Sequence, residues 1–98
     1  MYIGTNIKKF ALSLGFKLWV TKHEEHTVLN IYDVERDRLV VNYDGYGKGY
    51  VRGKVKLLPQ YRLSELPMVL SNENHLADLL RQLQGMKQHY DFLQHRNG

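Results

Sequence analysis

Apolar and polar residues alternate with two different periods along this chain. From Thr5 onward, apolar residues recur at the three- and four-residue spacing of a helix, with Thr5 as its N-cap and Gly15 at its end. From Phe16 the period changes to two residues, which is the spacing of a half-buried strand. The sequence therefore predicts a short helix followed by a β-region.

Four strands are predicted in this β-region, because alternating segments are separated by short polar or glycine-rich breaks. In chain order the strands span 16–21, 27–32, 38–43 and 49–58. Pro59 ends the sheet, since proline has no N–H to donate and disfavours helix in the residue before it. Such short connections favour an antiparallel meander.

The C-terminal third of the chain carries helical patterns. Ser64 could cap a short helix that has Pro67 in its first turn. After Ser71 a longer helix is predicted by an apolar stripe: Leu76, Leu79, Leu80, Leu83, Met86, Tyr90 and Leu93. Gly85 weakens its middle by about 1 kcal/mol relative to alanine, which would allow a division into two pieces. Residues 95–98 are expected to fray.

These elements predict one α+β domain over residues 1–98. We expect a four-stranded antiparallel meander sheet with an N-terminal helix and C-terminal helices packed on one face. The 98 residues contain no cysteine, which excludes disulfides, thiolate nucleophiles and cysteine-ligated metals. No apolar run approaches the roughly 18 residues of a membrane span. We therefore expect a cytoplasmic protein without a membrane partner.

Strict alternation leaves the second face of the sheet uncovered. Six residues are expected to point toward the helices: Leu18, Leu29, Leu39, Val41, Val51 and Val55. The opposite face would then carry Lys17, Trp19, Thr21, Val28, Asn30, Tyr32, Val40, Asn42, Tyr50, Arg52, Lys54 and Lys56, with Tyr46 and Lys48 continuing the same parity into the loop.

Positive charge is concentrated in the same region. The formal charge is +4, and residues 45–62 hold five cations and no acid, whereas the rest of the chain is nearly balanced. Aromatic rings that stack on bases, together with cations that follow phosphates, form a single-stranded nucleic-acid platform. We therefore predict a nucleic-acid interface, for single strands above all, that comprises Trp19, Tyr32, Tyr46, Lys48, Tyr50, Arg52, Lys54 and Lys56.

Segment 48–55 can be compared with the octapeptide of RNA-recognition motifs, K/R-G-F/Y-G/A-F-V-x-F/Y. Its first three positions agree with that pattern. Val51, Arg52 and Val55 replace the small residue and two aromatics, and the predicted strand order is not βαββαβ. The chain is therefore not assigned to that family.

A protein-interaction module is the alternative hypothesis. The aromatic set could form an interface with a protein partner or a second copy, in which Trp, Tyr and Arg are the usual anchors. The basic segment could also be a solvated edge strand whose lysines discourage edge pairing. Small size and the lack of a catalytic constellation would suit accessory proteins of bacteriophages and mobile elements.

Enzymatic chemistry is not predicted. His23 and His26 are three residues apart, unlike the histidines of H-E-x-x-H, and no metal site or other cofactor is expected. Residues 45–49 form G-x-G-x-G, which falls short of the dinucleotide fingerprint. The carboxyl groups of Asp33, Glu35 and Asp37 are expected in a turn, where water surrounds all three. Nothing would then shift the pKa of one carboxyl group away from that of another, as a general acid and base pair requires.

Overall fold

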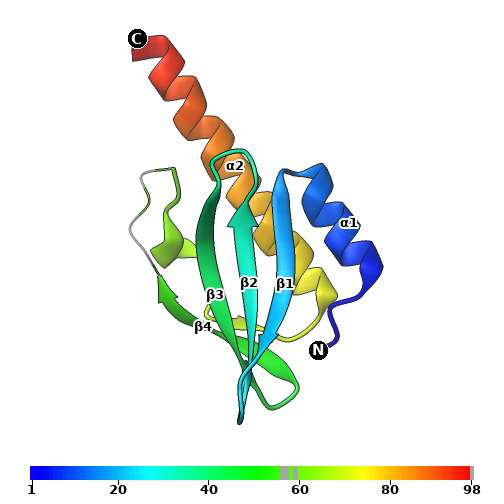
Figure 1. The fold of residues 1–98 in the computed structure, drawn as a ribbon. Helices are drawn as coiled ribbons and strands as arrows, with labels where there is room; N and C mark the ends of the chain where they lie inside the picture. The colour runs from blue at the N-terminus through cyan, green and yellow to red at the C-terminus, as the bar shows by residue number, and fades with distance from the viewer. Residues whose placement is uncertain (56–57, 59, 98) are drawn as a thin grey trace.

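The computed structural model describes residues 1–55, 58 and 60–97, without the side chains of residues 54, 55, 96 and 97. Its described elements follow the order helix, four strands, one 3-10 turn, a two-residue strand and a long helix. Figure 1 shows the strands side by side, with α2 (Glu73–Asn97) crossing behind them. The fold is α+β, as the sequence predicts.

The strands form an antiparallel meander in which neighbours along the chain are neighbours in the sheet. Its order is β1-β2-β3-β4-β5. The bounds are β1 Phe16–Lys22, β2 Thr27–Asp33, β3 Arg38–Tyr46, β4 Gly49–Val55 and β5 Val69–Leu70. The fifth strand was not predicted, because two residues are too few to show an alternating pattern. Residues 56 and 57, predicted to continue the fourth strand, lie outside the described residues.

The connection between β3 and β4 is tighter than expected. β3 continues through Tyr46 and β4 begins at Gly49, so the predicted loop shrinks to a two-residue turn. Gly47 in this turn has φ of +58°, a value that favours glycine. The turn therefore places Tyr46 and Lys48 at the end of a β-hairpin rather than in an open loop.

The helical part differs from the prediction in two ways. α2 is one continuous helix through Gly85, because its apolar stripe remains packed on either side of that glycine. Residues 63–65 form only a 3-10 turn, η1 (Leu63–Glu65), and Pro67 lies beyond its end. At the other end of the chain, α1 (Thr5–Ser13) has Gly4 rather than Thr5 at its N-cap position.

The core lies between the sheet and the two helices. Buried leucines of α2 and Ile7 and Ala11 of α1 pack against the strands, and the cluster includes Phe16, Leu18, Leu29, Ile31, Val40, Val41, Tyr43, Tyr50, Leu76, Leu79, Leu80 and Leu83. α2 continues past the sheet at its C-terminal end (Figure 1). No helix in the described part of the chain is both long and apolar enough to cross a membrane.

Two β-bulges change which residues share a face. The β2–β3 register shifts between Ile31 and Tyr32, and the β3–β4 register shifts between Val41 and Tyr43. Each bulge inserts one residue, so the simple two-residue count fails beyond it. These shifts decide the composition of the face that the helices leave free.

Candidate interaction surface

The open face is the side of the sheet that points away from α1 and α2. Three rows of laterally paired residues cross it: Lys17–Tyr32–Leu39, Trp19–Asn30–Asn42 and Thr21–Val28–Asp44–Val51. None of their apolar members belongs to the core cluster, although Val28 is itself buried. These ten residues define the open face in the rest of the text.

An aromatic pair stands at one side of the open face. The rings of Trp19 and Tyr32 meet edge to face, with centroids 5.8 Å apart, and Trp19 is 37% exposed. The Lys17 ammonium lies 6.0 Å from the centre of the indole, at the limit of a cation–π contact. The pair therefore presents a rigid apolar surface next to one positive charge, as predicted for Trp19 and Tyr32.

Two asparagines, Asn30 on β2 and Asn42 on β3, follow Trp19 in the middle row. The Asn30 amide nitrogen donates to Thr21 Oγ1 at 2.9 Å and reaches the carbonyl oxygens of Trp19 and Val28 at 3.3 Å each. Asn30 is thus fixed by its neighbours and only 8% exposed. Asn42 Oδ1, in contrast, is buried and has no hydrogen-bond partner among the described residues. A buried acceptor without a partner costs free energy.

Tyr50 is not on the open face, contrary to the sequence prediction. It pairs with Gly45, on the same side as Tyr43, and is 6% exposed within the core. The reason is the bulge in β4, which adds one residue between Arg52 and Val55. Residues nearer the turn therefore point to the opposite side of the sheet from the side that simple alternation from Val55 predicts. Val51, expected in the core, takes the place of Tyr50 on the open face beside Asp44.

Arg52 is also on the helix side of the sheet. It pairs with buried Tyr43, and its guanidinium donates to the carbonyl oxygens of Leu63, Ser64 and Leu66 at 3.0, 3.3 and 2.8 Å. These bonds hold the η1 turn against β4. The cation that the sequence assigns to a phosphate-binding surface is therefore used inside the fold.

The bulge in β3 exchanges Leu39 and Val40. The sequence places Leu39 in the core and Val40 on the opposite face. Instead, Val40 is 1% exposed within the core, and Leu39 pairs with Tyr32 on the open face. The exchange makes the open face more apolar beside its aromatic pair.

The remaining predicted site residues lie at the hairpin end of the sheet or outside the description, and Tyr46, two residues after Asp44 in β3, is on the same side of the sheet as the open face. Tyr46 is 77% exposed at the β3–β4 turn, and Lys48 is exposed beside it. The side chain of Lys54 and the whole of Lys56 lie outside the described residues. Of the eight predicted residues, the structure therefore brings together Trp19 and Tyr32 on the open face, with Tyr46 and Lys48 at a hairpin end.

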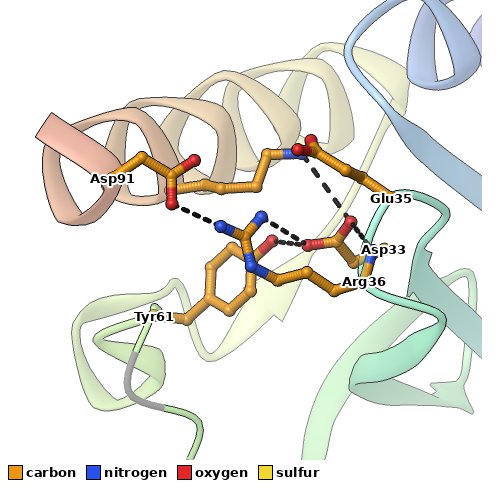
Figure 2. Close-up of polar contacts among 6 residues, drawn as sticks. Asp33, Glu35, Arg36, Tyr61 and Asp91 are labelled. Atoms are coloured by element: carbon orange, nitrogen blue, oxygen red, sulfur yellow. Dashed lines mark hydrogen bonds and ion pairs between the residues drawn. The ribbon is translucent and has the colours of Figure 1, made fainter. Parts of the chain in front are cut away.

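A buried ionic cluster was missed by sequence reasoning (Figure 2). Asp33, expected to be solvated, is 0% exposed. It accepts a hydrogen bond from the Tyr61 hydroxyl at 2.5 Å, and its oxygens lie 3.7 Å from Lys87 Nζ and from an Arg36 guanidinium nitrogen. Arg36 also bonds Asp91 on α2. The cluster joins β2, α2 and the segment at residue 61.

This cluster has the character of a structural brace. Burial, and next the hydrogen bond to Asp33, raise the pKa of Tyr61 well above its ordinary value, so its hydroxyl stays a donor. The charge of Asp33 faces two cations, which compensates for its removal from water. No position along the sequence announces this arrangement, because Asp33, Tyr61 and Lys87 come from three distant segments.

Other polar groups gather at the turns. A hollow of about 340 Å³ lies where the N-terminus meets the β1–β2 and β3–β4 turns, and its lining includes His26, Gly45 and Tyr50. The rings of His23 and His26 stack with centroids 5.1 Å apart. Within the described residues, no group of three or more histidine, aspartate or glutamate side chains is arranged to hold a metal ion.

Comparison of the chain with protein-family models, with curated proteins and with solved structures found no match. The functional argument therefore depends on the geometry of the open face.

Proposed function

We propose that the chain is a non-enzymatic protein-binding module that uses its open face. The observation that carries this proposal is the edge-to-face pair of Trp19 and Tyr32, bordered by Leu39 on a surface that the helices leave uncovered. Aromatic side chains that are rigid and partly exposed are the usual anchors of protein interfaces.

The charge of the open face favours a protein partner over a nucleic acid. Among its ten residues only Lys17 is a cation, and Asp44 is an anion, so these side chains sum to zero. Nucleic-acid affinity comes largely from cations that neutralise phosphates. Protein interfaces, in contrast, are depleted in charge at their centres. Arg52, which would have added a cation, donates to carbonyl groups on the helix side.

Nucleic-acid binding remains the second candidate. Exposed Tyr46 and Lys48 at the hairpin end are the observation that favours it, since an aromatic ring beside an ammonium can stack on a base and contact its phosphate. This site would lie at the turn rather than across the sheet. Its affinity would fall steeply with added salt.

Selection of peptides tests the proposed function. A random 12-residue peptide library displayed on phage is panned on the folded chain, and selected peptides are synthesised and measured by calorimetry. We expect peptides with an apolar or aromatic centre, whose affinity falls at least tenfold in Trp19→Ala and Tyr32→Ala. Tyr2→Ala, which removes an exposed ring from outside the sheet, is the matched control and should change affinity less than twofold.

A parallel titration with a fluorescent mixed-sequence single-stranded DNA at low salt separates the two candidates. Weak binding that is unaffected by Trp19→Ala supports the protein-binding proposal. Selected peptides that bind equally to wild type, Trp19→Ala and Tyr32→Ala, or DNA binding that is lost with Trp19→Ala, would overturn it.

A further inference from the structure

Two of the ten open-face residues are charged, and they stand at diagonally opposite corners of the part that β1, β2 and β3 form. Lys17 lies on β1 in the row of Tyr32, and Asp44 lies on β3 in the row of Val28. From ordinary strand and residue spacings, the corners are about 17 Å apart. Asn30, on β2 in the middle row, lies midway between them. Both corner side chains are exposed.

This diagonal makes the face complementary to itself. A two-fold axis that lies in the plane of the interface and passes over Asn30 exchanges the corners. It places Lys17 of one copy opposite Asp44 of the other, and the same pair forms a second time by symmetry. A face with two like charges would bring like charges together about the same axis.

On this basis we propose that the partner of the open face is a second copy of the chain. The inference rests on the proposed function and names the occupant of the same surface. The charge complementarity just described is its main support, because exposed opposite charges then meet twice in one symmetric contact. The strands of the two sheets would cross closer to the orthogonal than to the aligned mode of sheet packing.

The same axis also brings uncharged residues of the two copies into matching positions. Projected onto the sheet, Trp19 comes nearest to Val28 of the second copy, which matches an aromatic ring with an apolar side chain. Tyr32 comes nearest to Asn42 of the second copy, which places a phenol beside a polar side chain. Packed sheets lie about 10 Å apart, a separation that side chains of this size fill.

Charge reversal tests the proposal through sedimentation velocity over a concentration series. The wild type is expected to form a reversible dimer. Lys17→Glu places two pairs of like charges in the interface, and so does Asp44→Lys. The dissociation constant of the dimer should therefore rise at least tenfold in each variant alone. An equimolar mixture of the two variants forms two opposite-charge pairs and should return to within threefold of the wild-type dissociation constant.

The controls separate folding from association. Lys9→Glu changes the net charge by the same amount as Lys17→Glu but lies on α1, and it should dimerise like wild type. Far-ultraviolet circular dichroism of each variant verifies the fold. A mixture no more dimeric than its components would overturn the proposal, as would a dimer unchanged by either reversal. A wild type that stays monomeric at millimolar concentration but binds selected peptides through Trp19 overturns only the second-copy partner. Loss of both properties overturns the proposed function as well.

Discussion

The guanidinium of Arg52 contributes to the fold at the scale of a single residue. Its bonds to the carbonyl groups of Ser64 and Leu66 reach acceptors at the end of a short 3-10 turn, and its bond to Leu63 O adds to the one that this carbonyl accepts from the Leu66 N–H. A backbone hydrogen bond also holds β4 to the segment after η1, because the Arg52 N–H donates to Met68 O at 2.7 Å. A side chain of this kind stabilises the folded chain rather than a complex.

Arg52→Met should therefore lower the free energy of unfolding. We expect a loss of about 2 kcal/mol, because hydrogen bonds from a charged donor are lost and the carbonyl groups are left with water or nothing. Urea unfolding followed by circular dichroism measures this. Arg38→Met, at an exposed position on β3, is the control and should change stability by less than about 0.5 kcal/mol. Equal stability of the two variants would contradict this role for Arg52.

A buried phenol links this region to pH. Burial raises the pKa of Tyr43 to about 12, an increase that the nearby Arg52 charge partly offsets. Above pH 10 the unfolded chain loses this proton while the folded chain keeps it. The stabilising contribution is therefore complete below pH 10 and is lost as the pH rises toward 12. Burial also raises the pKa of Tyr61, so this residue likewise contributes stability that is lost at high pH.

Tyr43→Phe should flatten the loss of stability at high pH. Each tyrosine of this kind can contribute a slope of up to about 1.4 kcal/mol per pH unit. Urea unfolding at pH 9, 10 and 11 gives the slope for wild type and variant. Tyr43→Phe also loses the bond to Pro67 O, so the comparison concerns slopes and not absolute stabilities. Identical slopes would show that Tyr43 does not carry the effect.

At the scale of elements, close backbone approach determines where glycine is needed. A Cβ on Gly49 would lie 2.6 Å from Leu70 O, so β4 and β5 can pair only while that position has no side chain. A Cβ on Gly85 would have nothing within 4 Å, and this residue lies inside α2. The two glycines therefore differ in what they contribute.

Alanine substitutions at these glycines should change stability in opposite directions. Gly49→Ala is expected to destabilise the fold by more than about 1 kcal/mol, because a backbone clash separates two strands. Gly85→Ala is expected to stabilise it by about 1 kcal/mol through helix propensity. Thermal unfolding of both variants provides the comparison. A stabilised Gly49→Ala or a destabilised Gly85→Ala would contradict the packing described for β5 or α2.

Elements also show how far the sequence could predict the site. Alternation placed Lys17, Trp19 and Tyr32 correctly, since β1 and β2 pair without a bulge between them. It failed for Tyr50 and Arg52, because an inserted residue in β4 reverses the count. Glycine within a strand often marks a bulge, so Gly53 was the available signal. Nothing in the local sequence of β3 marks its own bulge.

The whole molecule determines which charges are free to act. A segment count gives residues 45–62 an excess of five cations, but folding directs Arg52 into carbonyl groups and pairs Arg62 with Glu65 at 3.0 Å. Asp33 shows the same limitation, because its partners Tyr61 and Lys87 are known only once distant segments meet. Strand order and helix positions follow from local patterns, whereas charge pairing depends on tertiary structure.

The indole N–H resonance of Trp19 gives the most direct test of the open face as a protein-binding surface. It is recorded in the nitrogen-labelled chain, at a concentration where the chain is monomeric, while two probes are added separately: a library-selected 12-residue peptide and single-stranded DNA at 50 mM salt. The account predicts that the peptide shifts this resonance in a saturable manner and that the DNA leaves it in place. A resonance that shifts with the DNA and not with the peptide would contradict the account.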